Sequence, residues 1–112
     1  MELELNKSNV LIELGYILMK VTEEQNKGAG IFEIVRLTRE FIQQLKIHSI
    51  EIKDGTVYLT LERCGLFFGR QGKLYERIVK DLGRINGFKN LEIVEDKVMP
   101  DLYAFEYSTG EY

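Results

Sequence analysis

The stretch GLFFGRQGK, residues 65–73, joins a very apolar turn to a glycine-rich and basic one. Two glycines flank Arg70 and Gln71, and Lys73 follows them. A Gly-x-x-Gly turn at the start of a helix leaves backbone N–H groups free and places few side chains in the way, so that a phosphate can approach the backbone closely. The stretch therefore predicts either an anion-accepting loop or a tight turn that only joins two helical segments.

Basic residues follow the glycines at helical spacing. At about 100° per residue they form one stripe along a helix that we predict from about residue 72 to residue 85. The members of the stripe are Arg70, Lys73, Arg77, Lys80 and Arg84. Apolar residues lie on the opposite side, namely Leu74, Ile78, Leu82 and Ile85. Such a stripe is either a solvated helix face or a surface for an anionic ligand, and spacing alone does not decide between the two.

Charge is distributed unevenly along the chain. The formal net charge is −3 over 112 residues, which argues against a general nucleic-acid binder. Residues 69–89, however, hold six Lys or Arg against two Asp or Glu, whereas residues 90–112 hold one Lys against six Asp or Glu. Because local potential steers a ligand more than net charge does, an anionic ligand is expected at the basic segment.

Hydrophobic periodicity divides the chain, which has the length of one domain, into helices and strands. A period of 3.6 predicts helices over 8–25, with Ser8 or Asn9 as N-cap, over 31–46, over a short turn at 65–68, and over about 72–85. A period of 2 predicts strands over 48–53 and 56–62, joined by an Asp-Gly hairpin turn, and a third strand around 91–94. Residues 102–107, in the tail beyond Pro100, are a candidate extra strand.

This order of elements resembles the layout of a type II KH domain. The stretches LKIHSIEI (45–52), VYLTL (57–61) and GLFFGRQGK (65–73) resemble the KH domain of the S-three family of small-subunit ribosomal proteins. The likeness covers about residues 31–98. It implies an α+β fold of α-β-β-α-α-β order, with a three-stranded mixed sheet and helices on one face. Residues 1–30 would be an extra helical extension, and residues 99–112 an acidic tail.

The resemblance implies non-enzymatic binding of single-stranded RNA or DNA, with RNA as the first expectation and a ribosome-associated role as one possibility. The loop would grip the backbone of about four nucleotides beside an apolar groove. Carried over by position, the loop is Gly69, Arg70, Gln71 and Gly72. Phosphate contacts come from Lys73 and Arg77, and the same stripe continues to Lys80 and Arg84. The apolar groove is assigned to Leu66, Phe67 and Phe68, and no cofactor is implied.

The chain also departs from the ribosomal pattern. Gln71 stands where such loops often carry a second basic residue, and Cys64 stands where the family tends to have proline. An acidic tail would repel nucleic acid. These departures keep open a second function, in which a KH-fold interaction subunit or small regulator has lost RNA affinity and docks a protein partner.

The remaining polar residues suggest no catalytic or metal-binding arrangement. The chain has one cysteine, Cys64, and one histidine, His48, which removes an internal disulfide and most metal and nucleophile–base sites. We expect Cys64 to be half-buried at a strand end, and His48 to begin a strand without a partner. The carboxylate pairs Glu23-Glu24 and Glu95-Asp96 diverge in a helix or a strand, so both are expected in solvent. An enzyme is therefore not predicted.

The helix predicted over 8–25 is apolar over more than half of its circumference. Its apolar residues are Val10, Leu11, Ile12, Leu14, Tyr16, Ile17, Leu18, Met19 and Val21. Such a helix has to be buried on more than one side, so we expect a homodimer or another protein partner through it. The apolar runs are too short to span a membrane, and the acidic N-terminus is unlike a signal peptide, so a cytoplasmic location is expected.

Overall fold

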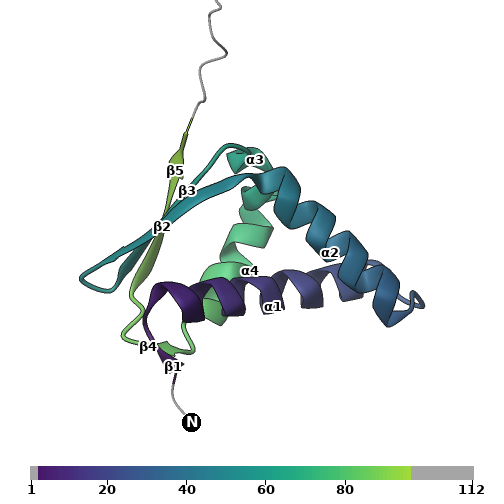
Figure 1. Ribbon diagram of the computed structural model, residues 1–112, viewed down its shortest axis with the longest axis horizontal. Coiled ribbons are helices and arrows are strands. Elements are labelled where there is room, and N and C mark those ends of the chain that lie inside the picture. The colour runs from purple at the N-terminus through teal and green to yellow at the C-terminus, as the bar shows by residue number, and fades with distance from the viewer. Residues whose placement is uncertain (1–2, 97–112) are drawn as a thin grey trace, which may run out of the picture.

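The computed structural model describes residues 3–96 as an α+β fold (Figure 1). In chain order the elements are β1 (Leu3–Glu4), α1 (Lys7–Gln25), α2 (Ile31–Leu45), β2 (Ile47–Lys53), β3 (Thr56–Leu61), α3 (Cys64–Phe68), the 3-10 turn η1 (Arg70–Gly72), α4 (Lys73–Leu82), β4 (Ile85–Asn86) and β5 (Asn90–Glu95). Among these residues, no helix is both long and apolar enough to cross a membrane.

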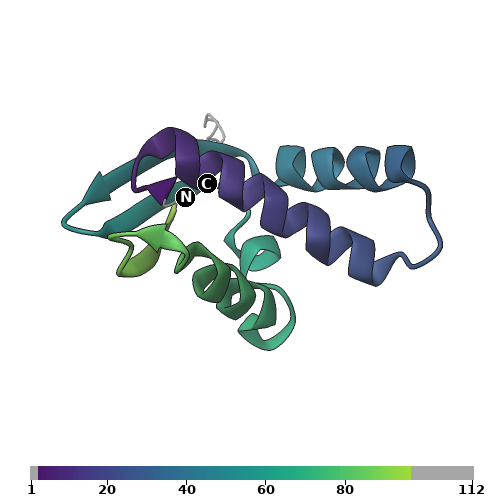
Figure 2. The same cartoon turned by 90° about the horizontal axis from the view of Figure 1, so that it is seen from below.

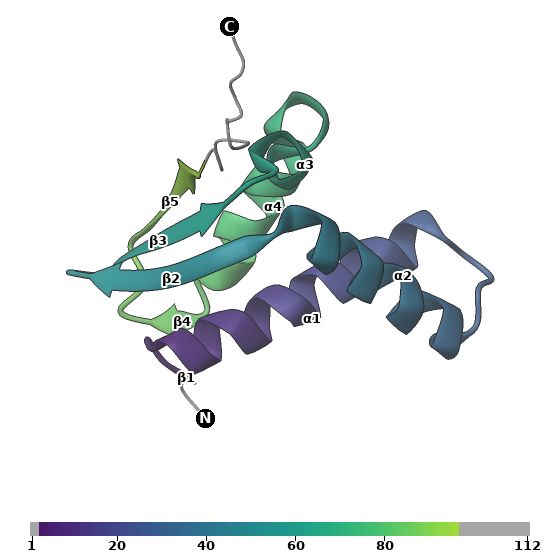
Figure 3. The ribbon, with the colours of Figure 1, turned by 45° about the horizontal axis from the view of Figure 1, so that its top comes forward.

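Three strands form one mixed sheet, in which β3 lies between β2 and β5 (Figure 3). The hairpin of β2 and β3 turns at Asp54 and Gly55, whose φ angles of 51° and 84° suit a tight turn between twisted strands. β5 runs parallel to β3 and places Leu91 beside Val57. Parallel neighbours need a long crossover connection, and the segment from α3 to α4 supplies it.

The helices cover one face of this sheet. Along β3, Val57, Leu59 and Leu61 are at most 2% exposed, whereas Tyr58 on the opposite face is 36% exposed. The helical side of the core is built by buried residues of several helices, namely Val10, Leu14, Ile17, Leu18, Leu45, Phe67, Ile78 and Leu82. Because α1 contributes four of them, the N-terminal helix shares one core with the rest of the fold.

α1 lies between α2 and α4, as the view from below shows (Figure 2). Its N-terminal half crosses in front of the sheet, and its C-terminal half packs beside α2. One side of α1 therefore faces away from every other described element.

The α+β class and the three-stranded mixed sheet were predicted, but some boundaries were not. Asn6, rather than Ser8 or Asn9, caps α1, because its side chain accepts a hydrogen bond from the N–H of Asn9 at 2.8 Å. The helix predicted to residue 85 ends at Leu82.

Ile85 instead belongs to β4, which pairs in parallel with β1 and places Ile85 beside Leu3. This two-stranded ladder was missed. The candidate strand over 102–107, and all of the tail assigned to 99–112, lie outside the described residues.

Candidate nucleic-acid interface

The loop between α3 and α4 has a left-handed backbone. Gly69 has φ of 74° and ψ of −169°, Gln71 has φ of 58°, and Gly72 has φ of 75°. Only glycine readily adopts the conformation of Gly69. A Cβ at this position would also stand 2.7 Å from the Cβ of Leu74, so the loop packs closely on the first turn of α4. A Cβ at Gly72 would meet no atom within 4 Å, and the space beside that residue is open.

Four of the five predicted cations are exposed, two of them at the loop and two toward the other end of α4, and none of these four is in an ion pair within residues 3–96. They are Arg70, Lys73, Lys80 and Arg84. Lys73 and Lys80 lie on α4, and Arg70 lies in the loop itself. Arg84 follows the end of α4 rather than lying on it, because the helix stops at Leu82.

The fifth cation, Arg77, is held by two carboxylates. Its Nη1 and Nη2 atoms donate to the two Oε atoms of Glu24 at 2.9 and 3.0 Å, and its Nε donates to Asp81 at 3.1 Å. The hydrogen bonds from Arg77 lower the pKa of the Glu24 carboxyl, and those contacts raise the pKa of Arg77. Glu24 is exposed, as predicted, but it is also paired, and two carboxylates compensate the positive charge of Arg77 in the folded chain.

A groove of about 570 Å³ opens beside the loop, between α1, α2 and the start of α4. Its lining combines apolar and basic side chains, including Val21, Phe41, Leu66, Leu74, Arg70 and Lys73. An apolar wall next to unpaired cations can accept the flat face of a base together with its phosphate. Glu24 and Arg77 line the same groove, so their ion pair lies where the groove meets α1.

The three residues assigned to the apolar groove lie in different surroundings. Phe67 is fully buried in the core at 0% exposure, so it cannot offer a surface to a base. Leu66 and Phe68 are 36% and 38% exposed. Of the three, Leu66 alone lines the groove, because successive positions on α3 point in different directions.

Phe68 packs against Tyr75, with ring centroids 5.1 Å apart. The hydroxyl of Tyr75 donates to the carbonyl of Leu91 on β5 at 2.6 Å. Burial, with a smaller effect from the charge of Glu92, raises the pKa of Tyr75. This pair joins the loop to the sheet on the side of α4 away from the groove.

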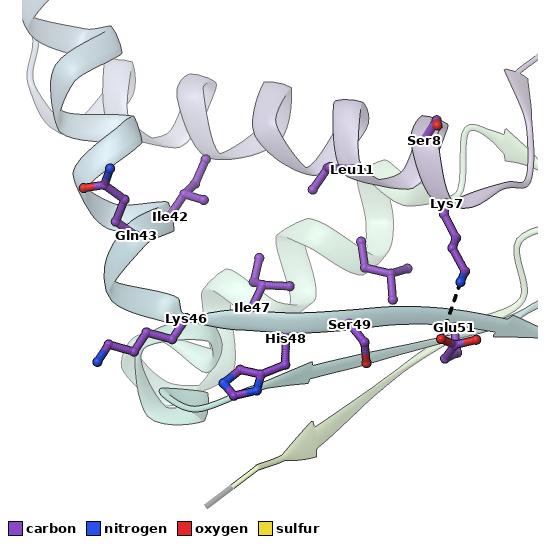
Figure 4. Close-up of a pocket in the computed structure, with 11 residues that line it drawn as sticks. Lys7, Ser8, Leu11, Ile42, Gln43, Lys46, Ile47, His48, Ser49 and Glu51 are labelled. Atoms are coloured by element: carbon purple, nitrogen blue, oxygen red, sulfur yellow. Dashed lines mark hydrogen bonds and ion pairs between the residues drawn. The ribbon is translucent and has the colours of Figure 1, made fainter. Parts of the chain in front are cut away.

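A second cleft, of about 720 Å³, separates α1 from β2 and the end of α2 (Figure 4). Leu11, Ile42 and Ile47 point into it, and Lys7 bridges one end by an ion pair to Glu51 at 3.4 Å. It shares no lining residue with the groove beside the loop, and it contains none of the predicted binding residues.

His48 has partners that the sequence did not reveal. Its Nε2 lies 2.7 Å from Glu62 and its Nδ1 lies 3.0 Å from Asp96, at the ends of β3 and β5. The expectation that His48 has no partner is therefore wrong, and Asp96, which was expected in solvent, contacts this ring while its side chain stays partly exposed.

Cys64 is half-buried, as predicted, but it is the first residue of α3 rather than the end of a strand. Burial, and to a smaller extent the charge of Glu95, raises the pKa of this thiol. Within residues 3–96, no group of three His, Cys, Asp or Glu side chains is placed to hold a metal ion.

Sequence reasoning missed four residues that line the groove: Val21, Glu24, Gln25 and Phe41. Glu24 is 53 residues from Arg77, and no local pattern records such a contact. Phe41 lies on the helix predicted over 31–46, and its neighbours in the sequence do not mark it as a groove residue.

Neither a protein-family model, nor a curated protein, nor a solved structure matches this chain. What the molecule does is therefore inferred from the loop, the groove and the charges around them.

Proposed function

We propose that the chain is a non-enzymatic KH-like module of type II that binds single-stranded nucleic acid, with RNA as the first candidate, through the loop 69–72 and the cations beside it. The observation that carries the proposal is the left-handed loop between α3 and α4, with Arg70 and Lys73 unpaired next to it within the described chain. A backbone phosphate is the ligand that such a loop accepts, since the first N–H groups of a helix have no partner within the helix.

The arrangement of elements supports the same interpretation. The order α2, β2, β3, α3, loop, α4, β5, with β3 antiparallel to β2 and parallel to β5, is compatible with a type II KH topology. On this proposal α1 is an addition to the domain, and it forms one wall of the groove through Val21 and Glu24.

The lining of the groove supports separate roles for its basic and its apolar side chains. Arg70 and Lys73 would contact phosphates, while Leu66 and Phe41 would pack against bases. Lys80 and Arg84 would extend the phosphate track along α4. Arg77 would contribute only where its ion pair with Glu24 opens.

The test is a fluorescence-anisotropy titration of a mixed-sequence single-stranded RNA 10-mer, with the DNA 10-mer beside it. For three or four phosphate contacts we expect affinity to fall roughly twenty- to fiftyfold between about 50 and 200 mM salt. The double variant Arg70→Asp with Gln71→Asp should abolish binding. Aspartate tolerates the left-handed backbone of position 71, so the variant should stay folded.

The matched control is Arg39→Asp with Gln43→Asp, which places the same residue change on exposed positions of α2. This control should bind within about twofold of the parent chain, because it changes net charge equally but lies outside the groove. Equal loss in both variants would reject the loop as the site and leave only a general effect of charge.

A second function is favoured by the contact between Glu24 and Arg77. The basic stripe already accepts a carboxylate from the chain itself, and an acidic protein surface offers the same group. On this alternative, the chain is an interaction subunit that docks an acidic protein. Absence of RNA and DNA binding at low salt, together with salt-sensitive binding of a poly-glutamate peptide that the loop variant loses, would favour it over the first.

A further inference from the structure

We propose that residues 97–112, called here the tail segment, bind within the same molecule to the groove beside the loop 69–72 and compete there with nucleic acid. The tail segment follows Asp96, the last residue that the structure describes. The inference deepens the proposed function, and it rests on that function for its regulatory consequence. The tail segment is then an autoinhibitory ligand of the groove, which a stronger polyanion displaces.

The groove has an excess of positive charge. Its lining holds three cations, Arg70, Lys73 and Arg77, against one carboxylate, that of Glu24. Arg77 already binds this carboxylate, whereas Arg70 and Lys73 form no ion pair within residues 3–96. The lining therefore accepts a carboxylate of this chain at one position and attracts further anions at two others.

The composition of the tail segment matches both parts of the lining. Its acidic residues are Asp101, Glu106 and Glu111, against one lysine, Lys97. Its aromatic residues are Tyr103, Phe105, Tyr107 and Tyr112. A carboxylate pairs with arginine or lysine as a phosphate does. An aromatic ring packs on the apolar wall of Phe41 and Leu66 as a base would. The tail segment thus combines the two chemistries by which the groove would recognise a nucleotide.

The tail segment also begins near the groove. The N–H of Asp96 donates to the carbonyl of Leu61 at 3.0 Å, and α3 begins three residues after Leu61, at Cys64. β5 therefore ends beside α3, and the loop follows α3 directly (Figure 1). α3 has five residues and is only about 7 Å long. An extended chain spans about 3.3 Å per residue, so Phe105 can lie up to about 30 Å from Asp96. This reach is enough to pass around α3 and enter the groove.

Covalent attachment favours the tail segment over a separate acidic protein as the occupant. Docking within one molecule proceeds at an effective concentration on the order of 1 mM for a short linker. Contacts with an intrinsic dissociation constant of roughly 0.3 mM then keep about three quarters of the molecules closed. Because only open molecules bind nucleic acid, the apparent affinity falls about fourfold.

The first experiment tests docking without nucleic acid. The chain has no tryptophan, so Phe105→Trp introduces a single fluorescent reporter in the tail segment. Its emission should move to longer wavelength when Arg70→Asp and Gln71→Asp are added, because the ring leaves the groove for water. The pair Arg39→Asp with Gln43→Asp should leave the emission unchanged. Equal emission in the loop and control variants would overturn the proposal, and so would a response that appears only at high protein concentration, which would mean docking between two molecules.

The second experiment measures competition in the full chain. The triple variant Asp101→Asn, Glu106→Gln and Glu111→Gln keeps the aromatic residues and removes the carboxylates of the tail segment. Its affinity for the single-stranded 10-mer should rise about fourfold, the reciprocal of the closed-state penalty.

The matched control removes three carboxylates elsewhere, by Glu4→Gln, Asp54→Asn and Glu92→Gln. These positions are exposed and do not line the groove. The control should raise affinity by less than about twofold, since it changes net charge alone. Equal gains in both triple variants, or no gain in the tail variant, would overturn the inference. If no variant binds nucleic acid while the tryptophan emission still responds to the loop, the proposed function fails and docking of the tail segment stands.

Discussion

The guanidinium of Arg77 donates two hydrogen bonds to the carboxylate of Glu24, at 2.9 and 3.0 Å. This ion pair joins α1 to α4 beside the loop. A bidentate pair between a carboxylate and a guanidinium is one of the stronger side-chain interactions in proteins. In this chain the contact compensates the charge of one cation in the middle of the basic stripe. The N-terminal helix therefore sets how much positive charge the groove offers.

Removing the carboxylate should strengthen binding of a polyanion. Glu24→Gln releases the Nη1 and Nη2 atoms of Arg77 for a phosphate while Nε keeps its contact with Asp81, so we expect affinity for the single-stranded 10-mer to rise roughly two- to fivefold at low salt. The slope of log affinity against log salt should steepen by about 0.7, which corresponds to one more phosphate contact on a single strand. Glu23→Gln changes the net charge equally from the neighbouring position and is the matched control. Equal effects of the two variants would show that only net charge matters.

The ion pair between Glu24 and Arg77 should be lost at acid pH. The pKa of Glu24 is lowered by Arg77, so its contribution to folding is complete above the pKa of the unfolded chain and is lost as pH falls through the lower folded value. We therefore expect the parent chain to be more stable than Glu24→Gln near pH 6, and the difference to vanish well below pH 4. Urea unfolding at several pH values measures it. A difference that persists at low pH would mean that glutamine disturbs α1 for another reason.

The two glycines of the loop should differ in their tolerance of alanine. In Gly69→Ala, alanine has to adopt a backbone conformation that only glycine readily adopts, and its Cβ clashes with the side chain of Leu74. We expect the free energy of unfolding to fall by about 3 kcal/mol. In Gly72→Ala the added Cβ has free space, so only the left-handed backbone is unfavourable, and we expect the free energy of unfolding to fall by about 1 kcal/mol. Urea unfolding compares them. Similar losses in both variants would contradict the packing of Gly69 on α4.

The neighbouring phenylalanines should separate stability from binding. Phe67→Ala empties a fully buried position, and we expect a loss of about 3–5 kcal/mol. Phe68→Ala removes a partly exposed ring and its contact with Tyr75, at a cost of about 1 kcal/mol. Thermal unfolding gives the ranking. If Phe68→Ala proved the more damaging change, the assignment of the two rings to core and surface would be wrong.

Local patterns in the sequence predicted the elements and the loop. Alternation along Val57, Leu59 and Leu61 reflects burial of one strand face, and the Asp54-Gly55 pair meets the dihedral demand of a hairpin turn. The glycines at 69 and 72 likewise correspond to left-handed backbone in the structure. Each of these features depends on residues a few positions apart, which is why one sequence was enough to predict them.

Contacts between distant parts of the chain, and the end of α4, were decided by the tertiary structure. The pairing of Arg77 with Glu24, the placement of His48 between Glu62 and Asp96, and the end of α4 before Ile85 all depend on segments far apart in the chain. Period and composition do not record which distant side chains meet, because that is settled by how helices and strands pack. The sequence alone therefore determined where cations and glycines occur, whereas packing determined which cations remain free and which rings reach the surface.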